Sequence, residues 1–202
     1  LILAGAGSGK TRVLTHRIAY LIENGFAEPE DILALTFTNK AAKEMKERAA
    51  SLTGKAADKM LITTFHSACV KFLKNRMMLL GYKRGNFVIY DTDEQKKIIR
   101  AIFEETDFQS RCPEIKEYNV ISFISKQKEK MLGPDELESI YPDYPLITVY
   151  KEYERILKKN NALDFDDLLV KTVDLFEKCQ DVLEAYQERF RYIMVDEYQD
   201  TN

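Results

Sequence analysis

A glycine-rich segment near the start of the sequence has the residue types of a phosphate-binding loop. Its sequence is Ala4-Gly5-Ala6-Gly7-Ser8-Gly9-Lys10-Thr11, followed by Arg12. Glycines allow a tight turn in which successive backbone N–H groups point at a phosphate. Lys10 can reach the β- and γ-phosphates of a nucleotide, and the Thr11 hydroxyl can bind Mg²⁺. We predict that residues 4–12 bind nucleotide phosphates, although Ala4 stands where the strict motif has glycine. A plain glycine turn is the alternative.

Two acidic residues follow the last apolar run of the sequence. The run Tyr192–Val195 leads directly into Asp196 and Glu197. A carboxylate at the end of a buried strand suits Mg²⁺ beside a phosphate loop, so Asp196 is predicted to bind the metal together with Thr11. A neighbouring carboxylate can orient and deprotonate an attacking water, which predicts a catalytic role for Glu197 alongside Lys10. Taken alone, an acidic pair is also typical of a solvated turn.

Strands and helices are expected to alternate around both groups. Four apolar runs predict buried parallel strands, at Leu1–Ala4, Ile32–Thr36, Met60–Thr64 and Tyr192–Val195. Helical spacing of apolar residues follows the first three runs. These helices are expected from Lys10 to Gly25, after Thr38-Asn39, and from about Ser67 to Leu80. The alternation predicts an α/β fold with a parallel sheet flanked by helices.

The middle of the sequence has a different character. Helical patterns dominate residues 87–162, at Glu94–Glu105, Asn119–Lys130 and Ile147–Lys158, with one short strand at Phe87–Tyr90. We interpret this range as a mostly helical insertion between residues 1–86 and 163–202. It accounts for the 186 positions (196 − 10) that separate Lys10 from Asp196. Asp164 is expected to cap the next helix with Asp167. Both ends of the chain look cut, so we interpret it as a fragment.

The composition is that of an ordinary folded protein, with 45% apolar and 31% charged residues. No apolar run is long enough for a transmembrane helix, and no signal peptide is evident, which argues against a membrane partner. The three cysteines have no C-x-x-C spacing, so we expect no zinc site. Their small number fits a reducing compartment, so we expect a cytoplasmic location. Residues 1–84 hold 14 Lys+Arg and 7 Asp+Glu, against 16 and 26 in residues 85–202. A basic first part can bind phosphate, or be simply solvated.

Several blocks together resemble the superfamily 1 DNA helicases of the UvrD/Rep/PcrA type. The resemblance covers essentially the whole chain and is closest to PcrA-like bacterial enzymes. It is carried by Ala4–Thr11, Thr36–Ala42, Thr63–Ser67 and Asp196–Asn202, with Leu163–Leu169 as a further block. It implies a RecA-like P-loop NTPase domain with a helical inserted subdomain, and ATP and Mg²⁺ as cofactors.

The resemblance also implies a function. It implies ATP hydrolysis coupled to 3′-to-5′ movement on single-stranded DNA and unwinding at single-strand–duplex junctions, in DNA repair or replication. A second RecA-like domain of the same protein would complete the ATP site. The resemblance places Phe37 on a base and puts four residues near the DNA backbone, namely Thr38, Asn39, Thr64 and His66. From the residues alone, Thr38 and Asn39 can be a helix N-cap, Phe37 a core residue and His66 a packing residue.

Other functions stay open. The same blocks are typical of the helicase part of an AddA/RecB-type recombination helicase–nuclease. A phosphate-loop kinase acting on a small molecule would share the glycine-rich segment but would show no response to DNA. A catalytically idle binding module is disfavoured by the presence of Lys10, Thr11, Asp196 and Glu197.

Overall fold

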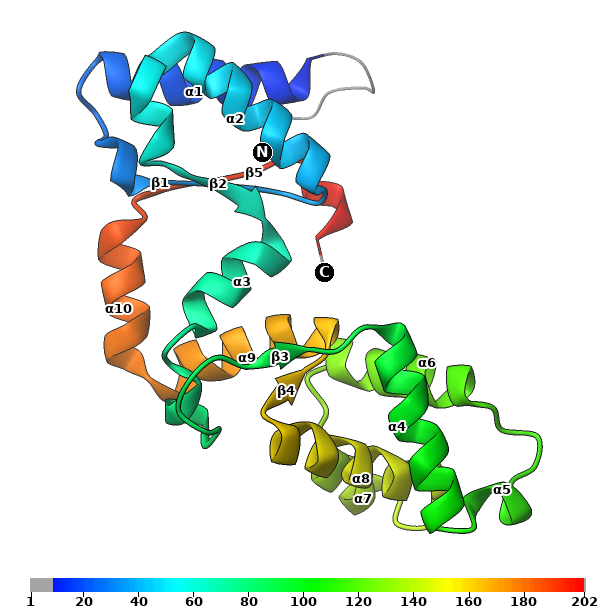
Figure 1. Cartoon of the computed structure of the whole chain (residues 1–202). Coiled ribbons are helices and arrows are strands. Elements are labelled where there is room, and N and C mark those ends of the chain that lie inside the picture. The colour runs from blue at the N-terminus through cyan, green and yellow to red at the C-terminus, as the bar shows by residue number, and fades with distance from the viewer. Residues whose placement is uncertain (1–8, 202) are drawn as a thin grey trace. The chain divides into compact units, whose positions relative to one another are not determined.

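The computed structural model describes residues 9–201, and these divide into two compact units (Figure 1). One unit comprises the chain up to Lys71 and from Phe176 onward. The other comprises Phe72–Leu175. These bounds are wider than residues 87–162, the insertion expected from the sequence. The expected strand at Leu1–Ala4 lies outside the described residues.

The first unit contains a parallel sheet with the strand order β2-β1-β5. The central strand β1 (Ile32–Thr36) is buried at every position, as expected for a strand covered on both faces. It pairs with β2 (Leu61–Thr64) on one side and with β5 (Tyr192–Val195) on the other. Two of these strands have the predicted bounds, and β2 begins one residue later than predicted. The parallel sheet expected from the sequence is therefore confirmed.

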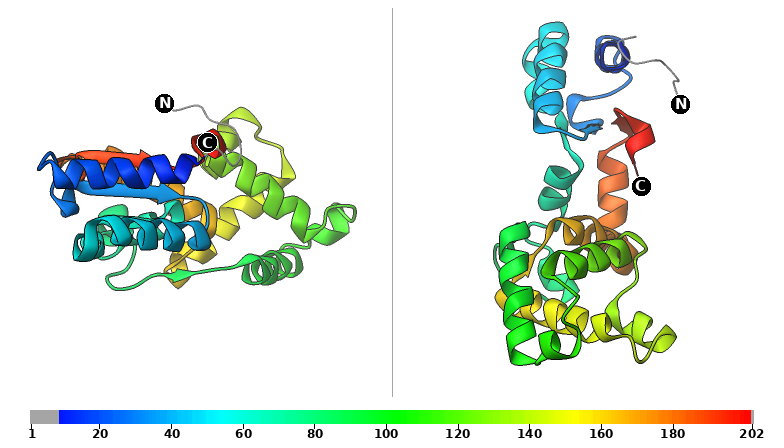
Figure 2. Two further views of the ribbon diagram at one scale, coloured as in Figure 1. Left: turned by 90° about the horizontal axis from the view of Figure 1, so that it is seen from above. Right: turned by 90° about the vertical axis from the view of Figure 1, so that its right-hand side faces the viewer.

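Two helices pack together on one face of this sheet (Figure 1, Figure 2). They are α1 (Lys10–Glu23) and α2 (Asn39–Thr53). Ile18 of α1, Met45 of α2 and Ile32 of β1 are fully buried in one apolar cluster. A short 3-10 turn, η1 (Pro29–Asp31), leads into β1. A second one, η2 (Gly54–Asp58), follows α2. On the other side of the sheet lie α3 (Phe65–Leu73) and α10 (Gln180–Arg189).

The third helix ends earlier than predicted. The sequence pattern predicted one helix from about Ser67 to Leu80, but α3 ends at Leu73 and a 3-10 turn, η3 (Met77–Leu80), follows. The break occurs because Asn75 has a positive φ of 64°, which a right-handed helix cannot contain. Gly81, also at positive φ, ends the segment as expected.

The second unit is mostly helical. Its apolar core is built chiefly from α4 (Thr92–Glu105), α6 (Glu117–Glu129) and α8 (Pro145–Asn160). Shorter helices are α5 (Phe108–Arg111) and α7 (Pro134–Ile140). Strand β3 (Val88–Ile89) pairs in parallel with β4 (Ala162–Leu163), directly before α9 (Phe165–Lys178). None of the helices among residues 9–201 is both long and apolar enough to cross a membrane.

Candidate active site

The start of α1 presents the lysine and threonine of the glycine-rich segment. Gly9 precedes the helix with φ 90°, a conformation that strains any residue with a side chain. Its carbonyl accepts a hydrogen bond from the N–H of Val13, at 3.0 Å, so the helix begins directly at Lys10. Lys10 and Thr11 therefore occupy the first turn, and Arg12 is exposed beside them. The predicted phosphate-binding residues 4–8 lie outside the described residues.

Lys10 forms an ion pair with Glu197. Its Nζ lies 2.8 Å from Glu197 Oε2, although the two residues are 187 positions apart. The hydrogen bond from Lys10 lowers the pKa of the Glu197 carboxyl below its ordinary value, and the side chain of Gln199 adds a second hydrogen bond. The same contact raises the pKa of Lys10. The lysine predicted to bind phosphate thus holds the predicted base as a carboxylate.

Thr11 contacts the other acidic residue of the pair. Its hydroxyl donates to Asp196 Oδ2 at 2.9 Å. The second oxygen of Asp196 accepts the N–H of Glu197 at 3.1 Å, and the residue is 4% exposed. The strand positions this group, because the N–H of Asp196 donates to Leu35 O at 2.9 Å and so extends the β1–β5 ladder by one residue.

These oxygens fit a magnesium ion. Mg²⁺ prefers hard oxygen ligands and commonly uses one or two protein groups together with phosphate oxygens and water. Thr11 and Asp196 supply a hydroxyl and a carboxylate within 2.9 Å of each other. They lie one residue from Lys10 and Glu197 respectively. The arrangement can hold a metal next to the ammonium of Lys10, which pairs with Glu197.

The backbone turns sharply at Glu197. This residue has φ 52° and ψ 49°, a left-handed backbone conformation that residues other than Gly, Asn and Asp rarely adopt. The turn at Glu197 separates β5 from a 3-10 segment, η4 (Tyr198–Asp200). Residues held in such conformations are concentrated at functional sites, where the surrounding structure offsets the strain.

A second group of predicted residues follows β1. Phe37 is 42% exposed, and its ring centroid lies 5.4 Å from that of Phe65. Phe37 is therefore available to a ligand instead of lying in the core. Thr38 is the N-cap of α2, since its hydroxyl accepts the N–H of Ala41 at 3.1 Å. Asn39 is exposed at the first helical position.

The two residues near β2 that were predicted to lie near DNA, Thr64 and His66, differ in exposure. Thr64 is 6% exposed, and its hydroxyl oxygen accepts the N–H of Ser67 at 3.2 Å. It also donates to Ser67 Oγ at 2.9 Å. Thr64 therefore caps the start of α3. His66 is partly exposed in the first turn of that helix.

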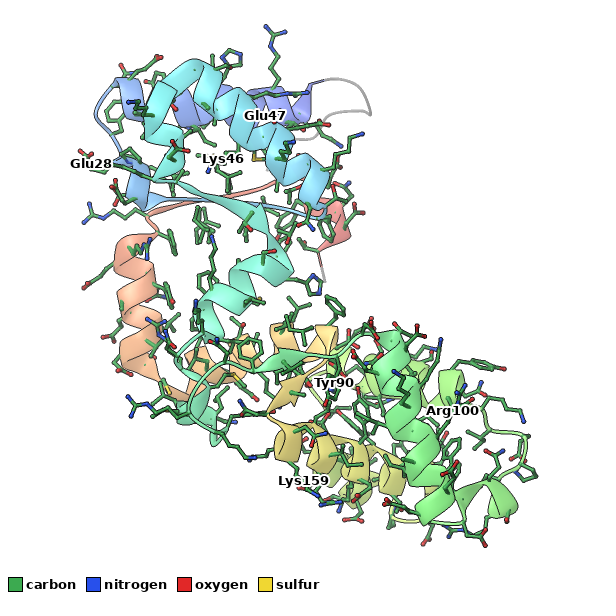
Figure 3. All side chains as sticks on the ribbon, viewed as in Figure 1. Glu28, Lys46, Glu47, Tyr90, Arg100 and Lys159 are labelled. Atoms are coloured by element: carbon green, nitrogen blue, oxygen red, sulfur yellow. The ribbon has the colours of Figure 1, made fainter. Side chains whose placement is uncertain are left out.

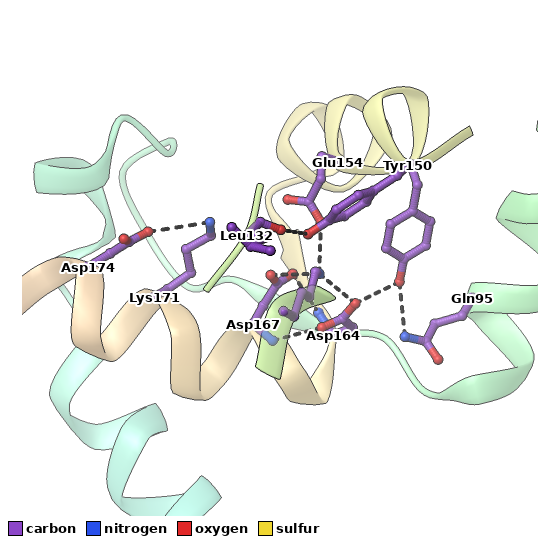
Figure 4. A network of polar contacts seen from close by, with 10 residues as sticks. Gln95, Leu132, Tyr150, Glu154, Asp164, Asp167, Lys171 and Asp174 are labelled. Atoms are coloured by element: carbon purple, nitrogen blue, oxygen red, sulfur yellow. Dashed lines mark hydrogen bonds and ion pairs between the residues drawn. The ribbon is translucent and has the colours of Figure 1, made fainter. Parts of the chain in front are cut away.

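Asp164 and Asp167 cap the start of α9, as the sequence predicted. The N–H of Asp164 donates to Asp167 Oδ2 at 3.2 Å, and the N–H of Asp167 donates to Asp164 Oδ1 at 2.8 Å. Both carboxylates also contact Lys128 Nζ, at 2.8 and 2.7 Å (Figure 4). Lys128 is 3% exposed, so the capping pair belongs to a buried ionic network in the second unit.

Three carboxylates share the single ammonium of Lys128. The third is Glu154 of α8, whose Oε1 lies 2.8 Å from Nζ but accepts no hydrogen bond from residues 9–201. Burial alone would lower the pKa of Lys128, but the carboxylates raise it well above its ordinary value. Burial raises the pKa of Asp167 to about 7. Burial alone would also raise the pKa of Asp164, but Lys128 and a hydrogen bond from Tyr153 lower it.

The sequence interpretation did not anticipate Lys128. A signal was present, because Val120, Ile124 and Lys128 recur every four residues and form the buried face of α6. A cation on an apolar helical face indicates a buried partner of opposite charge. The partners come from distant parts of the sequence, so the pattern alone does not identify them.

The chain is similar in sequence to known proteins along its whole length. Residues 1–202 match the family described as UvrD/REP helicase N-terminal domain. The chain is 47% identical over 205 aligned positions to the ATP-dependent DNA helicase PcrA of Bacillus subtilis, covering 100% of this chain and 27% of that protein. The PcrA proteins of Staphylococcus aureus and Staphylococcus epidermidis are likewise 47% identical, with 28% of their length covered. With a match along its whole length, the chain belongs to the UvrD/Rep helicase N-terminal domain family.

Proposed function

We propose that this chain is the ATP-binding part of a DNA helicase that hydrolyses ATP to move 3′-to-5′ on single-stranded DNA. The observation that carries the proposal is the meeting of Lys10 and Thr11 with Glu197 and Asp196. A lysine, a hydroxyl and two carboxylates are the groups that ATP hydrolysis requires at a phosphate loop. The PcrA relatives are named ATP-dependent DNA helicases, which supports the assignment.

The residues of this chain have separate tasks in the proposed reaction. Thr11 and Asp196 would hold Mg²⁺, which would neutralise charge on the phosphate oxygens. Lys10 exchanges its contact with Glu197 for the β- and γ-phosphates. Glu197 is then released as a carboxylate to orient the attacking water and accept its proton. The hydrogen bond from Lys10 lowers the pKa of Glu197, so this contact favours the carboxylate form before substrate arrives.

The proposed DNA contacts begin at the same edge of the sheet. Phe37 follows the last residue of β1, two positions beyond Leu35, which accepts the N–H of Asp196. Its exposed ring can stack on a base without sequence preference. Asn39 lies at the start of α2, where free N–H groups favour a phosphate. β1 thus connects the proposed ATP and DNA contacts through one rigid strand.

The test is Glu197→Gln in the longer protein that contains this chain. The amide keeps the size of the side chain but cannot accept the proton of water. We expect unchanged binding of a fluorescent ATP analogue and a decrease in DNA-stimulated hydrolysis of about 10²-fold or more. Hydrolysis at the unsubstituted rate would refute the role of Glu197. Hydrolysis that does not respond to single-stranded DNA in the unsubstituted protein would refute the helicase assignment.

A further inference from the structure

Phe37 and Phe65 are neighbours at the carboxyl ends of β1 and β2. The two strands pair in parallel, and the last pair of their register joins Thr36 to Thr64. Phe37 and Phe65 each follow directly, so the sheet brings them together although 28 positions separate them (65 − 37). Their ring centroids lie 5.4 Å apart, and the ring planes are inclined by 54°. Aromatic rings attract each other in a tilted arrangement at this separation.

The backbone beside each of these two rings is fixed. Thr38, directly after Phe37, caps α2 with its hydroxyl. Thr64, directly before Phe65, caps the start of α3 in the same way. Each aromatic residue is thus held between a paired strand and a capped helix. The freedom that remains to Phe37 lies in its side-chain torsions, which the contact with the second ring restricts.

The two rings differ in exposure. Phe37 is 42% exposed, whereas Phe65 is partly buried in the first turn of α3. Figure 3 draws the side chains along these elements, and its labels Lys46 and Glu47 identify α2, which begins two residues after Phe37. The ring of Phe37 is therefore available to a ligand, and the ring of Phe65 supports it. Such support favours binding, because a side chain that is already ordered loses less entropy when the ligand arrives.

We propose that Phe65 is a positioning residue that holds the ring of Phe37 in the orientation on which a DNA base stacks. The proposal rests on the proposed function, because the base contact of Phe37 belongs to it. Phe65 acts through Phe37 and contacts no base itself. The attraction between the rings, together with the order that it imposes on Phe37, corresponds to about fivefold in affinity for single-stranded DNA.

The first test compares affinities for labelled oligothymidylate in the longer protein that contains this chain. Phe65→Leu removes the ring but keeps an apolar side chain, and we expect the affinity to fall about fivefold. Phe65→Tyr keeps the ring and should keep the affinity. Phe176→Leu is the matched control, because Phe176 is also partly buried and pairs with the ring of Tyr186 in the same unit, at 5.8 Å. An unchanged affinity in Phe65→Leu, or an equal fall in Phe176→Leu, would overturn the proposal.

A double-mutant cycle shows whether Phe65 acts through Phe37. In the Phe37→Ala background no ring remains for Phe65 to hold, so the addition of Phe65→Leu should lower the affinity no further. If Phe65 contacted DNA directly, Phe65→Leu would weaken binding by the same factor in both backgrounds. A general loss of folding would do the same. Equal factors in the two backgrounds would therefore overturn the proposal.

A measurement without DNA separates this proposal from the proposed function. The aromatic carbon signals of Phe37 in NMR, assigned with Phe37→Leu, report whether the side chain keeps one rotamer. We expect one rotamer in the unsubstituted protein and averaging over rotamers in Phe65→Leu. Averaging in a protein that did not bind single-stranded DNA would keep the positioning role and refute the proposed function. A Phe37 that stayed ordered in Phe65→Leu, in a protein whose ATP hydrolysis responds to single-stranded DNA, would overturn this proposal alone.

Discussion

Thr11 and Asp196 lie 185 positions apart in the sequence and are joined by a hydrogen bond of 2.9 Å. The two residues stand at the start of α1 and the end of β5, so the bond connects a helix to the strand ladder of the same unit. The ion pair between their sequence neighbours, Lys10 and Glu197, runs beside it at 2.8 Å. Two adjacent polar contacts therefore define the candidate site.

Lys10→Met should raise the pKa of Glu197. The hydrogen bond from Lys10 is the main cause of the lowered pKa, and methionine removes it while nearly keeping the length of the side chain. We expect the carboxyl pKa to move up toward the value of an ordinary glutamate, about 4.3. The measurement is a pH titration of the carboxyl carbon by NMR. Gln199→Ala is the control and should produce a smaller rise, because Gln199 is the lesser contributor. An unchanged pKa in Lys10→Met would show that the pair does not exist in solution.

Phe37→Ala should weaken binding of single-stranded DNA. Base stacking on an exposed ring stabilises such complexes by about 1–3 kcal/mol per base. We therefore expect an affinity for labelled oligothymidylate that is lower by about tenfold, measured by fluorescence anisotropy. Phe26→Ala is a matched control, because Phe26 is also exposed, at 57%, and pairs with the ring of Tyr20 in the same unit. Equal decreases in both variants would contradict a specific role for Phe37.

Lys128→Met should destabilise the protein strongly. The change leaves Glu154, Asp164 and Asp167 without the ammonium that they share. Removing one partner of a buried ionic group costs about 3–5 kcal/mol, since the remaining charge stays buried. The free energy of unfolding, measured in urea, should fall by that amount at neutral pH. Lys126→Met on the same helix is exposed and should have little effect. A decrease below about 1 kcal/mol for Lys128→Met would contradict a stabilising role for the buried ammonium.

Asp167→Asn should remove a pH dependence of stability. The pKa of Asp167 is raised to about 7 in the folded chain, against about 3.9 for an unfolded aspartate. Between these values the folded state binds the additional proton, so Asp167 makes the free energy of unfolding fall as pH rises from about 4 to 7. The slope from this group is at most about −1.4 kcal/mol per pH unit, and it ends above the folded pKa. Urea unfolding at several pH values measures it.

The amide oxygen introduced by Asp167→Asn can still accept the N–H of Asp164, so the helix cap is retained in this variant. We therefore expect the variant to fold and to show a shallower decline of stability toward neutral pH. Asp166→Asn is the neighbouring control, because Asp166 lies outside the network. If the free energy of unfolding of Asp167→Asn declined with pH as steeply as that of the unsubstituted protein, the proton bound by the folded state would belong to another group.

Local sequence patterns predicted the elements that position the candidate site. The run Ile32–Thr36 and the run Tyr192–Val195 became strands with the predicted bounds, and the glycine before Lys10 marked the start of α1. These features depend on neighbouring residues, which is why the sequence alone was sufficient. The break of the third helix at Asn75 was missed, because asparagine is compatible with both helix and turn.

The buried network was missed for a different reason. Lys128 contacts Asp164 and Asp167, which are 36 and 39 positions away, and these pairings depend on how α6 and α9 pack. The family resemblance drew attention to the two aspartates but not to the lysine. Capping of α9 was predictable from the spacing of the aspartates, whereas their ion pairs with Lys128 were not.

The pairing of β5 with β1 has a consequence for how the protein is made. A ribosome releases β1 and β2 long before β5, and all of Phe72–Leu175 is synthesised in between. The edge of β1 that pairs with β5 therefore stays unpaired while the helical unit is synthesised and folds. Asp196 and Glu197 directly follow β5, so the growing chain carries Lys10 without its acidic partners until synthesis has passed both residues.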